Sequence, residues 1–571
     1  MTKDELLDTV WGNSFVEESN LSQTIFVLRK TLGESPKSPR FILTAPNRGY
    51  EFIASVREIN ANDAILEENI LLDVANPKSQ IPNPKSKWLA IPIILLIAFG
   101  AYWFYPKSKP VTVREIKTIA VLPFEDLSAE QTEKYLGVSL ADALANKFSR
   151  LKLITVRPTR TVLKYLEKRE DASKIGRELQ VDAVLDGRIQ RIGERIRVSV
   201  QLIRTADNVT IWTENFDDNF TNFFTVQDSI SQKVVQSLAL QIDEKERQKL
   251  NRRGTENAEA YQAYLLGRFF WNKRSANDLD RAIGHFKRAL EIDSNFAQAY
   301  AGLAETYAIY PAYAVVADQE SLPKARSAAT RALEIDGELA EAHTVLAYVQ
   351  SQYDFDWKGA EKSYLHAIEL NPNHATTRQW YGEFLAFQNR TEESLVQMQK
   401  AIELDPTSPS TNVAPALPYL ISHQFEKVLE TTDKVFQMDA TFLFAQHYKA
   451  RALFRLGREK EALELYRKIV VANGSAFFKS DLGCLYGKAG NEAEAKKILA
   501  ELTETAKEKY VSPYYFAVVH IGLNEREKAF EYLRKAVAEH DNNVIVLKVS
   551  ANFDSVRDDS QFIEILRSAN F

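Results

Sequence analysis

The sequence is poor in the residue types on which much metal and disulfide chemistry depends. Among 571 residues only Cys484 is a cysteine, which excludes an internal disulfide and any site with several cysteine ligands. All eight histidines lie at His285 or beyond, so the first half offers no histidine for acid–base or metal chemistry. The net charge of −5 excludes a uniformly basic coat for nucleic acid. Any nucleic-acid binding must therefore be local.

Catalytic sequence motifs are lacking as well. The chain contains no G-x-G-x-x-G, G-x-x-x-x-G-K-[ST], H-E-x-x-H or G-x-S-x-G motif. We therefore expect no cofactor, no metal site and no enzymatic activity.

Long hydrophobic runs are scarce, with one exception at residues 88–105. These 18 residues read WLAIPIILLIAFGAYWFY and carry no charge. As a helix they would cover about 27 Å, close to the roughly 30 Å hydrocarbon core of a bilayer. Aromatic residues at both ends and lysines on both flanks are typical of a single transmembrane helix. The flanking charges are nearly balanced and do not decide its orientation.

A predicted linker precedes this apolar run, and a predicted domain follows it. Residues 58–87 contain Asn-Pro-Lys-Ser twice and predict a linker. Residues 116–245 predict an α/β domain, with a buried strand at residues 119–122 and a half-buried, alternating strand at residues 195–204. A helix from about residue 225 to 242 is expected to close this domain.

From about residue 258 the chain repeats with a regular period. A small or β-branched residue recurs near the start of a helical segment at spacings of 43, 35, 34, 34, 34, 33 and 34 residues. These positions are Ala282, Ala325, Ala360, Ser394, Val428, Ala462, Ala495 and Ala529. The second helix of a repeat ends in a recurring phrase, such as Ala-Ile-Glu-Leu-Asp-Pro at residues 401–406.

This pattern resembles the tetratricopeptide family, which implies pairs of antiparallel helices over residues 258–571, including a C-terminal cap. Ala367 and Ala401 are expected to be buried between helices. Asn373 and His374 fall in an inter-repeat turn, where replacement is expected to do little. The 43-residue spacing predicts about nine extra residues around Tyr310 to Pro323. The resemblance implies a groove that binds a protein or peptide partner.

Residues 1–57 have the pattern of a helix followed by a β-hairpin. Leu21, Ile25, Leu28 and Leu32 form one apolar stripe of a helix that Gly33 would end. Residues 41–44 and 50–53 then predict two strands around a Pro-Asn-Arg-Gly turn.

The phrases KDELL at residues 3–7, VWG at 10–12, LRK at 28–30, LG at 32–33 and RGYEF at 48–52 resemble the OmpR/PhoB-type winged-helix family. The family's leading strands and first helix are missing, so the predicted winged helix is partial. Charge agrees with this resemblance, because residues 1–18 hold five acidic residues and one lysine, whereas residues 19–50 hold five basic residues and one glutamate.

The resemblance implies that the helix from about residue 19 enters the DNA major groove, with basic side chains at phosphates. Asn20, Gln23 and Val27 would then face base edges. Arg29 and Lys30 would meet phosphates, Arg40 lies in the basic loop after the helix, and Arg48 at the wing tip would reach the minor groove. The alternative is an ordinary solvated helix face.

The middle domain resembles the TolB amino-terminal-like (FlgO-like) module. The match rests on IAVLPF at residues 119–124, GREL at 176–179, VLDG at 184–187 and VQD at 226–228. The resemblance implies an interaction domain and transfers no catalytic residue.

Together these features predict a multidomain chain: a partial winged helix of the α+β class, a single transmembrane helix, an α/β domain and an all-α tetratricopeptide solenoid. This order resembles membrane-anchored one-component regulators of the ToxR/CadC type. It implies a bacterial inner-membrane protein with a cytoplasmic head bound to double-stranded promoter DNA. The extracytoplasmic repeats would sense a signal or a protein partner, and a homodimer is possible. The alternative is a membrane-tethered repeat scaffold for envelope proteins with a vestigial DNA-binding head.

Overall fold

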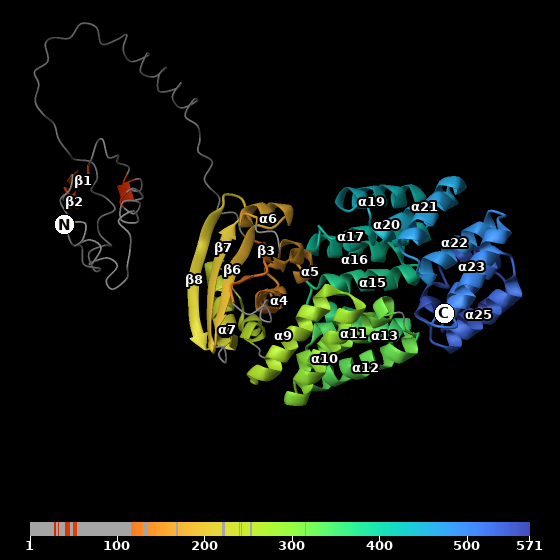
Figure 1. Ribbon diagram of the computed structural model, residues 1–571, viewed down its shortest axis with the longest axis horizontal. Helices are drawn as coiled ribbons and strands as arrows, with labels where there is room; N and C mark the ends of the chain where they lie inside the picture. Colours follow the sequence, from red (N-terminus) through yellow and green to blue (C-terminus); the bar gives the residue numbers. More distant parts are fainter. Residues whose placement is uncertain are drawn as a thin grey trace, which may run out of the picture. The chain divides into compact units, whose positions relative to one another are not determined.

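The computed structural model forms two compact units, residues 1–110 and 111–571, each of which is described by itself (Figure 1). The structure describes residues 25, 28–29, 32, 40–45, 49–53, 116–128, 135–166, 170–219, 223–238, 240, 242–251, 254–314 and 316–571. The predicted linker and the predicted transmembrane helix at residues 88–105 lie outside these residues.

In the first unit the predicted hairpin is confirmed. Strands β1 (Ile42–Ala45) and β2 (Gly49–Phe52) pair antiparallel, with Ile42 opposite Phe52 and Thr44 opposite Tyr50. Ile42 and Ile25, on the preceding helical segment, are both buried and form a small apolar core. The hairpin therefore packs on the helix, as the order of elements in the sequence predicts.

The second unit begins with a six-stranded mixed sheet of order β5-β3-β6-β7-β8, with β4 paired to β6. Short strands at its start are parallel, whereas the long strands β6, β7 and β8 form an antiparallel meander. The strands are β3 (Thr118–Val121), β4 (Glu125–Asp126), β5 (Thr155–Val156), β6 (Ala183–Ile192), β7 (Arg195–Arg204) and β8 (Val209–Asn219). The alternation that predicts a strand at residues 195–204 coincides with β7.

Helices cover both faces of this sheet. Helices α4 (Tyr135–Ser149) and α7 (Phe223–Ser237) pack on the face that carries Leu185 and Leu202. The other face, with Val184 and Ile203, is covered by the short elements α5 (Thr159–Val162), η2 (Leu163–Tyr165) and α6 (Ala172–Glu178). Successive strand residues point to opposite sides. The second face is apolar only where these short elements cover it, and along the rest of β7 it carries the exposed Arg195 and Arg197.

A helical array follows the sheet. A connecting helix, α8 (Glu244–Asn251), precedes it. Its first half comprises α9 (Ala258–Lys273), α10 (Ala276–Ile292), α11 (Ala297–Ala314), α12 (Asp318–Ile335), α13 (Ala340–Gln352), α14 (Trp357–Leu370), α15 (Ala375–Phe387) and α16 (Thr391–Leu404). Its second half comprises α17 (Pro409–Val413), α18 (Ala416–Ile421), α19 (Phe425–Met438), α20 (Leu443–Arg455), α21 (Glu459–Ala472), α22 (Ala476–Lys488), α23 (Glu492–Thr505), α24 (Pro513–Gly522) and α25 (Arg526–Ala538). The chain ends with η4 (Asn542–Val546), η5 (Ala551–Val556) and α26 (Ser560–Ser568).

The predicted repeat register is confirmed. All eight recurring small or β-branched positions, from Ala282 to Ala529, are fully buried, as are Ala367 and Ala401. Each of the eight lies in the second helix of a pair, and in α14 it is the fourth residue, Ala360. A small side chain is required here because neighbouring helices approach closely.

The sheet and the array share one apolar core, which explains why they form a single unit. Leu265 of α9 is buried against the sheet helices, and Tyr261, Tyr264 and Phe269 pack beside it. The Ser139 hydroxyl of α4 donates to the Leu265 carbonyl at 3.2 Å. The first repeat helix is thus also a layer of the sheet domain.

The C-terminal residues close back on the middle of the array. Phe355, in the turn before α14, is buried among the aromatic residues of the C-terminal helices. The ring of Trp357 stacks on that of Phe571 with centroids 4.6 Å apart, and its indole N–H donates to the Asn570 carbonyl at 2.9 Å. The cap at residues 540–571 therefore covers more than the last repeat.

These observations correct the predicted fold class. The prediction of four successive modules with a transmembrane helix is wrong for the part of the chain that the structure describes, which is mostly a tetratricopeptide-like helical solenoid with a small mixed sheet. No helix among the described residues is long and apolar enough to cross a membrane. The physical reason lies in the repeats: even the 18-residue helix α11 carries a buried glutamate, Glu305, and packs against other helices.

Candidate functional site

The structure describes two of the seven side chains predicted to bind DNA. Arg29 is buried, with 6% of its surface exposed, and its Nη2 donates to the Ile42 carbonyl and to Thr44 Oγ1, both at 2.8 Å. The guanidinium therefore joins the helix to strand β1. Nη2 of Arg29 is therefore bound to the hairpin, and the predicted phosphate contact of this residue stays a prediction.

The position of Arg29 also changes the predicted buried face of the helix. Leu28, which the apolar stripe places inside, is 43% exposed, whereas Ile25 and Arg29 are buried. Ile25 is buried as predicted and Leu32 packs against the same core, so among the described residues of the stripe only Leu28 departs, and Arg29 takes its place. A single arginine can replace a leucine there because its donors meet strand oxygens while its stem stays apolar.

Arg40 lies at the surface just before the hairpin, with its guanidinium 5.8 Å from the centre of the Phe41 ring. Because Arg40 is exposed, its guanidinium is accessible to a DNA phosphate. The predictions for Asn20, Gln23, Val27, Lys30 and Arg48 lie outside the described residues and stay predictions.

In the second unit, charged and amide side chains join the sheet domain to the array. Arg157, which follows β5, is 3% exposed and donates only to backbone carbonyls. Its Nε and Nη2 bind the carbonyls of Leu179 and Gln180, and its Nη1 binds those of Glu403 and Leu404 at 3.0 and 2.8 Å. The last two lie at the C-terminus of α16, where a cation is favoured by the helix dipole.

A second joint shows that one expectation is wrong. Asn373, predicted to tolerate replacement, directs its Nδ2 to the carbonyls of Leu151 and Ile154, each at 3.0 Å. Those carbonyls follow α4 of the sheet domain. The inter-repeat turn is therefore a docking point for that domain rather than a solvated loop.

A third joint is a buried charge network between α4, α9 and α11. Arg268 is paired with Asp142 at 3.0 Å and with Glu305 at 2.7 Å, and all three side chains are at most 11% exposed. Burial raises the pKa of Glu305 to about 7 even though the Arg268 charge opposes the shift. Such a network is stable only while every charge keeps its partner.

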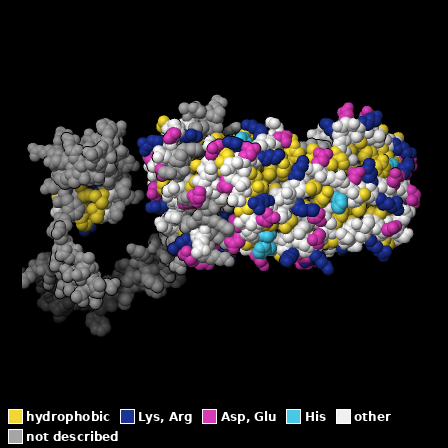
Figure 2. Space-filling view, turned by 90° about the horizontal axis from the view of Figure 1, so that it is seen from below, with side chains coloured by type: hydrophobic (Ala, Val, Ile, Leu, Met, Phe, Trp, Pro, Cys, Tyr) yellow, Lys and Arg dark blue, Asp and Glu magenta, His cyan; other side chains and the backbone are white. Residues whose placement is uncertain are grey.

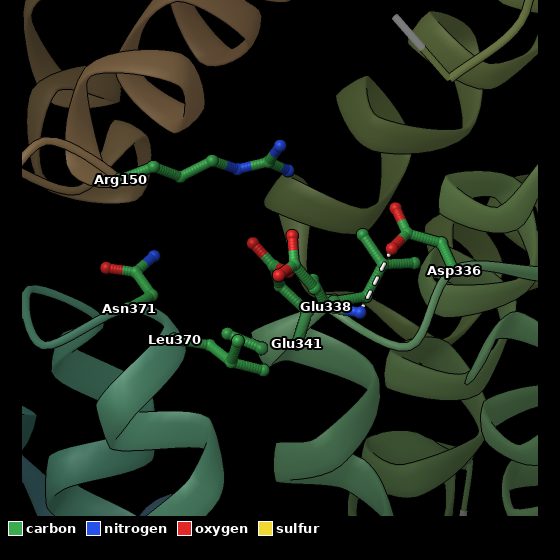
Figure 3. Close-up of a pocket in the computed structure, with 8 residues that line it drawn as sticks. Arg150, Asp336, Glu338, Glu341, Leu370 and Asn371 are labelled. Carbon is green, nitrogen blue, oxygen red and sulfur yellow. Dashed lines mark hydrogen bonds between the residues drawn. The ribbon is translucent and has the colours of Figure 1, made fainter. Parts of the chain in front are cut away.

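Figure 3 shows how Arg150, at the end of α4, reaches toward Glu338 and Glu341 at the start of α13. Burial acts to raise the pKa of Glu341, but the charges of Arg150, His374 and Arg268 overcome it and lower that pKa. The cavity between these side chains has a volume of about 20 Å³, enough for about one water molecule. This joint is therefore part of the interface and not a ligand site.

Sequence reasoning missed Arg157, Arg268 and Asn373, although a signal was present. The repeat phrase ends in Asp or Asn at residues 336, 371 and 405, and the sheet domain docks at the last two of these ends: Thr161 donates to Asp405 at 2.9 Å, and Asn371 binds Ser149. One face of the unit carries basic and acidic side chains in alternation, with no large patch of one sign (Figure 2). The described part of the second unit thus offers no broad basic surface on that face.

Comparison with known proteins gives the class to which these parts are similar. Residues 1–52 match the family described as "Transcriptional regulatory protein, C terminal". Residues 115–233 match the "HilA/YgeH-like transcriptional regulator, second domain". The second match replaces the predicted TolB amino-terminal-like resemblance, which is not supported.

Individual relatives agree with this class. The chain is 22% identical to transcriptional regulator HilA of Salmonella typhimurium over 415 residues, which cover 72% of this chain and 64% of that protein. It is 37% identical over 81 residues to the cholera toxin transcriptional activator of Vibrio cholerae, covering 14% of this chain and 27% of that protein. The chain is thus homologous to transcriptional regulators and spans less than two thirds of HilA.

One further relative has an enzyme's name. The Rhizobium meliloti protein called "Putative adenylate cyclase 3" is 29% identical over 190 residues, which cover 33% of this chain and 32% of that protein. Among solved structures, Pseudomonas aeruginosa PilF has a TM-score of 0.29 at 22% identity, covering 37% of this chain and 93% of that chain. A tetratricopeptide repeat protein from Parabacteroides merdae has a TM-score of 0.29 at 12% identity, covering 55% of this chain and all of that chain.

Proposed function

We propose that the chain is a transcriptional regulator whose N-terminal module binds double-stranded promoter DNA and whose repeat array binds a protein or peptide partner. The observation that carries the DNA-binding part is the match of residues 1–52 to a transcriptional regulator domain. The hairpin packed on a helix through Ile25, Ile42 and Arg29 supports it.

The test is binding of the full-length chain to the promoter fragment upstream of its own gene, measured by fluorescence anisotropy over a range of salt concentrations. Replacing Arg40 by Ala should weaken binding to all sequences and lower the salt slope by about one unit, since one phosphate contact is lost. Arg247→Ala is the matched control, because Arg247 is an exposed arginine on α8 of the other unit.

Two outcomes would contradict this function. The first is absence of binding at low salt, and the second is an Arg40→Ala variant whose affinity and salt slope equal those of Arg247→Ala. Either result would favour the alternative, a repeat scaffold with a vestigial head.

The proposal that the repeat array binds a partner rests on the contacts that its turns make with the sheet domain. The ends of two repeat phrases bind the sheet domain, which supports a role of the remaining repeats in contacts of the same kind. The inner-membrane localisation with a cytoplasmic N-terminus, and the homodimer, stay predictions from the sequence. Reporter fusions at residues 60 and 571 test the localisation, and light scattering tests the oligomeric state.

A further inference from the structure

The break in the repeat period has a structural result. Helix α11 has 18 residues, whereas the corresponding helix α13 has 13. Helix α12 begins at Asp318, seven residues before Ala325, whereas α14 begins only three before Ala360. The extra residues predicted around Tyr310 to Pro323 therefore lengthen the facing ends of α11 and α12.

These lengthened ends meet the C-terminal cap. The Asn542 backbone N–H donates to Asp318 Oδ2 at 2.8 Å, and Gln319 Nε2 donates to the Glu539 carbonyl at 2.6 Å. The residues joined are more than two hundred positions apart in the sequence. The inserted residues thus lie on one side of this contact, and the C-terminal cap lies on the other.

A cavity of about 390 Å³ lies where the two sides meet. Its size is in the range of pockets for small organic molecules. It is lined by the C-terminal end of α11, the start of α12, residues at or just before the starts of α20, α22 and α24, and the start of η4. None of the docking contacts of the sheet domain described above involves these residues.

The cavity combines aromatic walls with two carboxylates. Phe444, Phe477 and Tyr515 line it, and Phe444 is 48% exposed. Asp318 and Asp541 are the charged side chains among its described lining residues, which include no lysine, arginine or histidine. Aromatic faces and carboxylates are the two groups that attract an organic cation.

The two carboxylates differ in how fully they are bonded. Asp541 accepts hydrogen bonds from Ser512 Oγ and from both nitrogens of Asn543. Asp318 accepts one, from the Asn542 N–H. Burial raises the pKa of Asp318 to about 7; the Asn542 N–H bond acts against this rise, and the nearby Asp541 charge adds to it. Asp318 therefore lacks a counter-charge that a bound cation would supply.

We propose that this cavity binds a small organic amine, with the protonated nitrogen at Asp318 and the apolar body against Phe444 and Phe477. The ligand would join the insertion to the C-terminal cap. This inference goes beyond DNA binding and does not depend on it, so its test needs no DNA.

The experiment is isothermal titration of the full-length chain with three probe amines of increasing size: isobutylamine, phenethylamine and tryptamine. At least one is expected to bind at millimolar or lower concentration. 2-Phenylethanol, which has the same ring without the charge, should bind at least tenfold more weakly than phenethylamine.

Two variants, each with a control variant, locate the site. Asp318→Asn keeps an acceptor for the Asn542 N–H but removes the charge, and should weaken amine binding at least tenfold. Glu320→Gln, an exposed acidic residue in the same first turn of α12, removes the same charge outside the cavity lining and should change affinity less than twofold. Phe444→Ala should weaken binding severalfold, whereas the exposed Val471→Ala should not.

Three results would overturn the proposal. They are no heat for any of the amines at millimolar concentration, equal binding by the Asp318→Asn and Glu320→Gln variants, or tighter binding of phenylacetate than of phenethylamine. The last is a real alternative because the N-termini of α22 and α24 also open at the cavity and favour negative charge.

Discussion

The two halves of the array each bury a charged cluster, but they differ in where the counter-charge comes from. In the first half Arg268 is charged between Asp142 and Glu305, one of which comes from the sheet domain. In the second half Arg451 of α20 lies 3.9 Å from Asp481 of α22, and both belong to the repeats. His447 beside them is 3% exposed and hydrogen-bonded to the Tyr466 hydroxyl at 2.8 Å, and burial lowers its pKa to about 4. A histidine with this pKa is neutral at pH 7.

This difference shows what a second domain allows a repeat to do. A buried charge is tolerated where a neighbouring element supplies its opposite, as α4 supplies Asp142. Where the repeats have only one another, α22 supplies Asp481 to Arg451 of α20, and the buried His447 beside this pair is neutral. The same helical frame therefore holds a charged cluster in each half, and only the first takes a counter-charge from outside the repeats.

The charged cluster predicts the largest effect. Arg268→Met leaves Asp142 and Glu305 buried without a counter-charge, so the free energy of unfolding should fall by about 3–5 kcal/mol. Urea unfolding of the full-length chain measures it. Arg288→Met, at an exposed arginine of α10, is the control and should change it little. Equal losses in the two variants would show that the network adds nothing to stability.

The neutral histidine predicts a pH dependence of stability. Between about pH 6.5 and pH 4 the unfolded chain protonates His447 whereas the folded chain does not. Its contribution is therefore complete above pH 6.5 and falls by up to about 3 kcal/mol as the pH approaches 4. Stability curves of His447→Gln should lack this part of the slope. If that variant and His366→Gln, at an exposed histidine, give the same slope, the neutral state of His447 is wrong.

The arginine that joins the two domains predicts an intermediate effect. Arg157→Ala removes the donors to α16 and leaves buried carbonyls without them, which should cost about 2–3 kcal/mol. Limited proteolysis should then cut faster between the sheet domain and the array. The exposed Arg195→Ala on β7 serves as its control. Unchanged cleavage would mean that the other joints hold the domain in place without Arg157.

The smallest effect concerns the inter-repeat turn. Asn373→Ala removes two hydrogen bonds to the sheet domain and should cost about 1–2 kcal/mol. Asn295 has the same place in the first repeat phrase but is exposed, so Asn295→Ala should be nearly neutral. Thermal melts of the two variants give the comparison, and identical melting temperatures would contradict the docking role of Asn373.

The helical repeat was predictable because packing imposes it locally. A small residue is needed at each close helix contact, so Ala360 or Ala462 appears at a fixed period whatever lies around it. The strand β7 was predictable for a similar reason, since its alternation reflects one covered face. The expected helix over residues 225–242 is shorter, ending at Ser237.

The contacts between distant elements were not predictable from the same patterns. Arg157 and Asn373 look like ordinary surface residues, because their partners across the domain interface are backbone carbonyls more than two hundred residues away, which carry no sequence signature. Arg29 was misplaced because a basic residue beside an apolar stripe is usually solvated. Only the strand oxygens opposite it show why it is buried.

The stacking of Phe571 on Trp357 has a consequence for how the molecule comes apart. An open solenoid can unzip from either terminus, since each repeat depends only on its neighbours. Here the last residues also clamp the middle of the array, so fraying of the tail would expose the edge of α14 as well. The C-terminus is therefore a point at which the array is held closed, and its release is expected to loosen the middle repeats together with the last one.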